Sequence, residues 1–146
     1  MKILVDSCAW SILLRRKSKA LLSDEEQSVA ASLAEAIREG RVVMIGPIRQ
    51  EVLSGIKEPA QFQKLRSALE AFPDEPITTA HYEEAARLYN LCRSRGVECG
   101  PIDILLCALA IRERWKLLTN DGGILRCIEA LLAKGVSIPV TSSGVS

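Results

Sequence analysis

The sequence predicts an α/β fold, a three-layer sandwich in which helices cover both faces of a central parallel sheet of four to five strands. Four short, nearly continuous apolar runs suit strands that are buried on both faces. Helical segments with clear start and stop signals separate these runs, and such alternation favours parallel strands joined by right-handed crossovers. The chain has 146 residues, 48% of them hydrophobic, which suits one domain with a sizeable core. We therefore expect a single domain over residues 1–141, followed by a polar tail over residues 142–146.

The four apolar runs are the expected strands, and they cover residues 3–5, 42–45, 117–119 and 136–140. Pro139 lies in the last run. Because proline cannot donate a hydrogen bond to a neighbouring strand, this last strand is expected at an edge of the sheet.

The expected helices are recognised by their first residues and their apolar spacing. One helix follows the first strand, and the next has the capping-box spacing of Ser23 and Glu26 and ends at Gly40. The later helices begin at Pro47, Pro59, Thr79, Pro101 and about Ile124. The helix from Thr79 is expected to end at Gly96 and to bury Tyr82, Ala85, Ala86 and Tyr89. The resulting order is β-α-α-β-α-α-(short β)-α-α-β-α-β.

The charge and the longest apolar run exclude some classes of protein. Nineteen Lys and Arg against eighteen Asp and Glu give a net charge of +1, so any nucleic acid must be held by a local patch rather than by the overall field. The longest apolar run, residues 104–111, is far shorter than the roughly 20 residues that span a bilayer. We therefore expect no membrane segment.

The cysteine pattern favours a reducing compartment, and we expect a cytoplasmic protein. Five cysteines are an odd number, and no C-x-x-C pair is present, so neither a disulfide framework nor a zinc site is indicated. All five are expected to be buried thiols. The only histidine, His81, stands at a helix start and is expected to be a surface or capping residue.

Four carboxylates are predicted to meet at one edge of the sheet. Asp6 directly follows the first strand, and Asp121 follows the strand that ends at Thr119. Glu51 and Asp103 stand in the first turns of the helices that begin at Pro47 and Pro101. Ligands of open parallel sheets bind beyond the carboxyl ends of the strands, so these four acids are the candidate site.

Clustered carboxylates repel one another unless a cation joins them, and oxygen ligands suit Mg²⁺ or Mn²⁺. The chemistry that follows is metal-assisted hydrolysis of a phosphodiester bond by a metal-activated water, which needs no histidine. Taken singly, each acid also has a purely structural interpretation. Asp6 and Asp103 suit helix starts, Glu51 suits a solvated helix face, and Asp121 suits a turn.

Four blocks of the sequence resemble the motifs of PIN-domain ribonucleases, particularly VapC-type toxins of toxin–antitoxin pairs. Residues 5–10 read VDSCAW and are followed by LLR at 13–15, which is similar to the family's D-[TS]-[SN]-x-W start. The other blocks are PIRQEVL at 47–53, PIDILLCALA at 101–110 and LTND at 118–121. All four occur in the family's order and spacing.

The resemblance implies an endoribonuclease that binds Mg²⁺ or Mn²⁺ through Asp6, Glu51, Asp103 and Asp121, forms a homodimer and is silenced by an antitoxin protein. It also implies that Ser7, Thr119 and Asn120 orient the site. One departure is Gly123, which stands where many relatives carry a further acid. The basic run that begins Arg15, Arg16 and Lys17 is a candidate contact for the RNA backbone.

Three alternative functions stay open at this point. A PIN-type nuclease that processes RNA without being a toxin has the same motifs. An aspartate-based phosphoryl-transfer protein also has an Asp after its first strand, but it needs a second acid nearby and a lysine late in the sheet, whereas Lys116 begins its strand. A protein that binds metal only for structure is the third alternative.

Overall fold

The structure, a computed structural model, describes residues 1–17 and 21–141, with the side chains of residues 15–17 left out. The predicted tail, residues 142–146, lies outside the described residues. In chain order the elements are β1 (Ile3–Val5), α1 (Ser7–Lys17), α2 (Asp24–Arg38), β2 (Val42–Val43), α3 (Gly46–Ser54), α4 (Pro59–Leu69), α5 (Thr79–Arg93), α6 (Pro101–Glu113), β3 (Lys116–Leu118), α7 (Gly122–Ala133) and β4 (Val140–Thr141).

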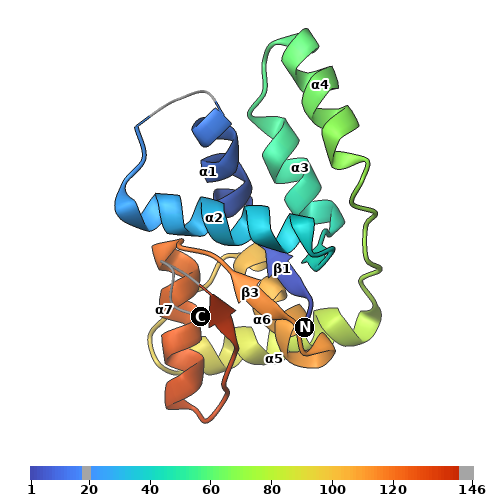
Figure 1. Ribbon diagram of the computed structural model, residues 1–146. Coiled ribbons are helices and arrows are strands. Elements are labelled where there is room, and N and C mark those ends of the chain that lie inside the picture. Colours follow the sequence, from blue (N-terminus) through green and yellow to red (C-terminus); the bar gives the residue numbers. More distant parts are fainter. Residues whose placement is uncertain (18–20, 142–146) are drawn as a thin grey trace.

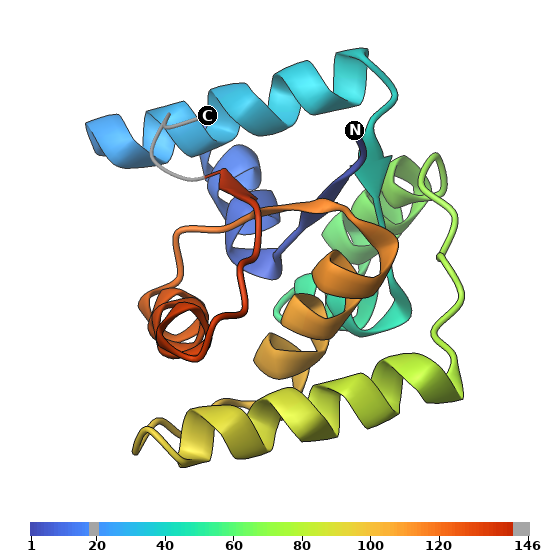
Figure 2. The same ribbon diagram turned by 90° about the horizontal axis from the view of Figure 1, so that it is seen from below.

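The four strands form one parallel sheet in the order β2-β1-β3-β4. Helices α1 and α2 lie on one side of it, and α5, α6 and α7 lie on the other, as Figures 1 and 2 show. This confirms the predicted α/β sandwich. The short strand expected between α4 and α5 is present as a single parallel bridge between Met44 and Asp74.

Helix α6 forms the centre of the layer opposite α2. Residues 104–110 are all buried, because the helix lies between the sheet and α5 (Figure 2). A helix that is apolar around its whole circumference is stable only in such a fully covered position. The buried helix fixes the position of its first turn, which carries Asp103.

The last strand is shorter than predicted, and it lies at the expected edge. Residues 136–138 are not part of the strand, because the N–H of Val136 donates to Leu131 O at 2.9 Å and so helps to end α7. Gly135 has a φ of +82°, the left-handed conformation that this type of helix end requires. Pro139 precedes β4, and its carbonyl accepts a hydrogen bond from the N–H of Leu117.

The buried face of α5 differs from the predicted one. Tyr82 and Ala86 are exposed, whereas His81, Ala85, Leu88 and Cys92 are buried. His81 has the expected capping role, since its Nδ1 accepts the N–H of Thr78 at 2.9 Å, but it is not a surface residue. Its Nε2 lies 3.2 Å from a carboxylate oxygen of Glu113, which supplies the polar partner that a buried imidazole needs.

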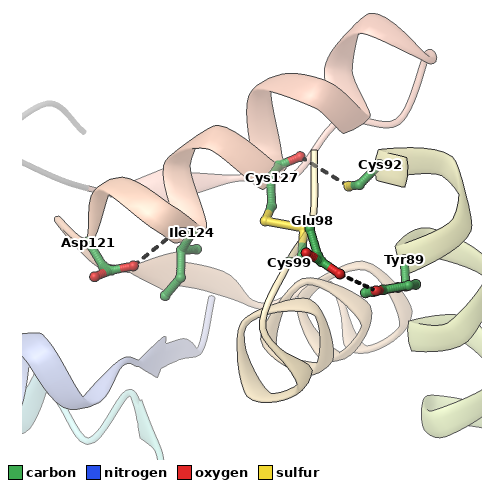
Figure 3. The surroundings of a disulfide bond; sticks show 7 residues. All are labelled: Tyr89, Cys92, Glu98, Cys99, Asp121, Ile124 and Cys127. Carbon is green, nitrogen blue, oxygen red and sulfur yellow. Dashed lines mark hydrogen bonds between the residues drawn. A yellow bond between two sulfur atoms is a disulfide. The ribbon is translucent and has the colours of Figure 1, made fainter. Parts of the chain in front are cut away.

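The prediction that all five cysteines are free thiols is wrong. Cys99 and Cys127 form a disulfide that joins the segment before α6 to α7 (Figure 3). Their Cα atoms lie 6.2 Å apart although 28 positions separate them in sequence, so tertiary packing alone brings them together. Cys8, Cys92 and Cys107 are free. The cysteine pattern therefore no longer argues for a reducing compartment.

Among the residues that the structure describes, no helix is both long and apolar enough to cross a membrane.

Candidate active site

Asp6 is held at the carboxyl end of β1 by three hydrogen bonds, one from its backbone and two to its carboxylate. Its backbone N–H continues the sheet by donating to Leu118 O at 3.1 Å, and its side chain is buried. Carboxylate Oδ1 accepts the backbone N–H of Ser7 at 2.7 Å, and Oδ2 accepts the hydroxyl of Thr119 at 3.0 Å. Ser7 therefore contacts Asp6 through its main chain.

Thr119 connects Asp6 to Asp121. The Thr119 side chain is fully buried, and its Oγ1 accepts the backbone N–H of Asp121 at 3.0 Å while donating to Asp6. Because β1 and β3 are neighbours in the sheet, the residues that follow them meet at one edge. Within the described part of the chain, the Asn120 side chain makes no hydrogen bond, so no contact supports the orienting role expected for it.

Asp121 has the turn role that its sequence suggested, and it also borders the other acids. Its Oδ2 accepts the N–H of Ile124 at 3.0 Å and caps the N-terminus of α7 (Figure 3). This cap explains why α7 begins at Gly122, two residues before the predicted start.

The electrostatics of Asp103 indicate that the other three candidate acids lie within range of its charge. Burial raises the pKa of the Asp103 carboxyl above its ordinary value, and the negative charges of Asp121, Asp6 and Glu51 raise it further. Glu51 lies on α3 and lines a hollow of about 790 Å³ together with Ser7 and Ile102. The structure thus brings together the four acids that the sequence singled out.

The donor chemistry of this cluster fits a hard divalent cation. Carboxylate oxygens are the ligands that Mg²⁺ and Mn²⁺ prefer, and the mutual repulsion that raises the pKa of Asp103 is what a cation would relieve. Across residues 1–17 and 21–141, however, no three His, Cys, Asp or Glu side chains are arranged closely enough to form a ready metal site. The four acids are neighbours, and binding of an ion would require their side-chain oxygens to move closer together.

Gly123, the departure from the family pattern, borders the acids directly. A Cβ at this position would lie 3.0 Å from Oδ2 of Asp121 and 3.8 Å from Oδ2 of Asp103. A side chain at 123 would therefore crowd the carboxylate that caps α7, which would have to move by a few tenths of an ångström. Gly123 is the residue that allows this carboxylate to lie against the backbone of α7.

Sequence analysis missed two side chains near the acids. The thiol of Cys8 lies 3.5 Å from Oγ1 of Thr119, and burial together with neighbouring Asp6 raises its pKa to about 12. This thiol stays protonated at neutral pH and is not a nucleophile. The other is Arg126, whose guanidinium lies over Gly122 and Gly123. Arg126 follows Gly122 by four positions and Gly123 by three. Residues at these spacings lie on the same face of a helix, so the sequence could have indicated that Arg126 lies near the two glycines.

The predicted RNA-contacting residues Arg15, Arg16 and Lys17 form the end of α1. Their side chains lie outside the described part of the structure.

Comparison with known proteins identifies a matching family and solved structures of similar fold. The model of the PIN domain matches residues 3–128. A crystal structure of FitAcB from Neisseria gonorrhoeae is 20% identical, with a TM-score of 0.72 and 97% of each chain covered. A structure of VapBC2 from Rickettsia felis, bound to a DNA fragment from their promoter, is 16% identical, with a TM-score of 0.69 over 97% of this chain and 98% of that one. No curated protein sequence matches the chain.

Proposed function

The chain belongs to the PIN-domain family of nucleases, and from this premise we propose that it is a metal-dependent endoribonuclease that hydrolyses RNA phosphodiester bonds. The observation that carries the proposal is the placement of four carboxylates at one edge of the sheet. Asp103 and Asp121 both border Gly123, Thr119 links Asp121 to Asp6, and Glu51 lines the hollow that Ser7 and Ile102 also line. We assign residues 1–141 to one nuclease domain.

Asp6, Glu51, Asp103 and Asp121 are the residues that would hold Mg²⁺ or Mn²⁺. A bound cation of this kind supplies a coordinated water of low pKa as the nucleophile and neutralises charge on the phosphate. The hydroxyl of Thr119 and the N–H of Ser7 keep Asp6 in one orientation, so little rearrangement is needed at that ligand. Of the four acids, Glu51 lines the hollow beside α3, and we place the RNA strand there.

We further propose that the protein is a VapC-type toxin. The four sequence motifs support this assignment, and one of the similar folds is named VapBC2. On this proposal the chain binds an antitoxin protein, forms a homodimer and acts in the cytoplasm. A PIN-type nuclease that processes RNA without being a toxin is the alternative. Growth arrest on expression, relieved by the product of a neighbouring small gene, would support the toxin.

The geometry does not support an aspartate-based phosphoryl-transfer protein. Lys116 pairs in register with Ile3, at the amino end of β1, whereas Asp6 follows the carboxyl end. The lysine that such a protein needs beside its aspartate is therefore at the wrong edge of the sheet.

The proposed activity is tested with Asp6→Asn and Asp103→Asn, which remove a carboxylate charge with almost no change in volume. Each is expected to reduce the rate of RNA cleavage far more than tenfold, since a metal ligand contributes several kcal/mol and about 1.4 kcal/mol corresponds to a factor of ten. Asp121→Asn is a less specific test, because Oδ2 of Asp121 also caps α7.

Glu35→Gln is the matched control, because Glu35 is an exposed carboxylate on α2. Cleavage by the wild type should require Mg²⁺ or Mn²⁺ and stop in EDTA. A folded Asp6→Asn protein that keeps more than about a tenth of the wild-type rate would contradict the assignment, and metal-dependent binding without cleavage would favour a structural metal site.

A further inference from the structure

An arginine side chain lies beside the acidic cluster without being paired to it. Arg126 is one turn into α7, and its side chain points back toward the N-terminus of the helix, as helical side chains do. A Cβ on Gly122 would lie 3.7 Å from Nη1 of Arg126, and a Cβ on Gly123 would lie 3.9 Å from Nη2. The same point above Gly123 is 3.0 Å from Oδ2 of Asp121 and 3.8 Å from Oδ2 of Asp103. The guanidinium and the two carboxylates therefore border one small space, which Gly123 leaves free of side-chain atoms.

The donors of Arg126 are unused in the described part of the chain. Arg126 is exposed, and it makes no ion pair or side-chain hydrogen bond with another described residue. The nearest carboxylate, that of Asp121, instead accepts the N–H of Ile124. Nor does Arg126 stabilise its helix, since positive charge near a helix N-terminus is unfavourable. No contact within the described fold thus accounts for an arginine at this position.

A second arginine extends this positive surface away from the acids. Arg95, in the turn after α5, lines a hollow of about 250 Å³ together with Arg126, Val97, Glu129 and Ala130. Like Arg126, Arg95 has no ion-pair partner among the residues described. Glu129 is the one carboxylate among the residues that line this hollow, so two guanidinium groups outweigh it.

We propose that Arg126 and Arg95 form a binding site for backbone phosphates of the RNA strand, next to the phosphate that the acids would engage. This proposal rests on the proposed nuclease function. A guanidinium binds phosphate oxygens through two parallel hydrogen bonds, and it stays charged at every relevant pH. In a chain with a net charge of only +1, such a local pair can hold a strand beside four carboxylates that would otherwise repel it. The site gives the strand a path along α7, distinct from the end of α1.

The test is equilibrium binding of a fluorescein-labelled, single-stranded RNA oligonucleotide of mixed sequence over a range of salt concentrations. Binding is measured in the Asp103→Asn background, so that cleavage does not consume the probe. Arg126→Gln and Arg95→Gln should each weaken binding and lower the slope of log K against log salt by about 0.7, the value for one phosphate contact on a single strand. Glu129→Gln should have the opposite effect and strengthen binding.

Arg41→Gln is the matched control. It removes the same charge at the opposite edge of the sheet, where the N–H donors of Arg41 contact Glu39 and Met1. If Arg126→Gln and Arg95→Gln bind RNA with the same affinity and salt slope as Arg41→Gln, the phosphate site is wrong, whether or not the protein cleaves RNA. If they weaken binding but the wild type with metal cleaves no RNA, the phosphate site stands and the nuclease proposal fails.

Discussion

Loss of the disulfide between Cys99 and Cys127 should destabilise the protein by an amount that the length of the closed loop predicts. The two cysteines are 28 positions apart. In the chain-entropy model, closing a loop of this length raises the free energy of the unfolded state by about 3.5 kcal/mol at 25 °C, because the unfolded chain loses entropy. The free energy of unfolding falls by about 1–3 kcal/mol for each 1 M of urea in small proteins. The urea concentration at the unfolding midpoint should therefore fall by at least about 1 M when the disulfide is lost.

The assay is urea unfolding of the wild type with and without dithiothreitol, beside the double variant Cys99→Ala/Cys127→Ala. Reductant should lower the midpoint of the wild type and leave that of the double variant unchanged, because the effect requires the bridge. Thiol counting on the denatured, non-reduced wild type should give three free groups, those of Cys8, Cys92 and Cys107. Five free groups would mean that the bridge does not form. Three groups with no effect of reductant would refute the loop-entropy argument.

Three further predictions concern the acids and the chemistry. Because the folded state raises the pKa of Asp103, this carboxyl favours folding below its ordinary pKa, and that stability is lost as the pH rises through the raised value. In EDTA, the urea midpoint of Asp103→Asn should therefore be higher than that of the wild type near pH 7 and equal to it near pH 3. Equal midpoints at both pH values would contradict the raised pKa of Asp103. Thr119→Val leaves an oxygen of Asp6 and the N–H of Asp121 without their partner and should cost about 1–3 kcal/mol in urea unfolding, whereas Thr119→Ser keeps the hydroxyl and should cost clearly less. A water nucleophile should leave 5′-phosphate and 3′-hydroxyl ends on cleaved RNA, and 2′,3′-cyclic phosphate ends in mass spectra would contradict the mechanism.

Much of the site could be predicted from the sequence, because its residues stand next to local signals. Asp6 and Asp121 follow apolar strands, and Asp103 and Glu51 follow helix-starting prolines. In a parallel sheet the carboxyl ends of the strands share one edge, so these local positions already imply a cluster. A separate local signal, the missing N–H of Pro139, predicted that the last strand lies at an edge of the sheet, and β4 does so.

Helix faces were predicted less well, because the apolar pattern of α5 is ambiguous. Tyr82 and Ala86 have the spacing of a buried stripe, yet the face that α5 buries carries Leu88 and Cys92. What decides the face is the orientation of the neighbouring helices, and the buried His81 pairs with Glu113 of α6. Only the assembled layers contain this information.

The parallel α/β architecture and the positions of the four candidate acids at strand ends and helix starts were predictable from the sequence, since periodicity, capping residues and strand ends are local properties of the chain. Tertiary structure decided which distant residues touch. It paired Cys99 with Cys127 and linked Asp6 to Asp121 through Thr119. It also brought Arg126 next to the acids and Arg95 into one hollow with Arg126. The physical reason is that each of these contacts depends on how helices and strands pack in three dimensions, and separation along the chain does not limit which residues such packing brings together.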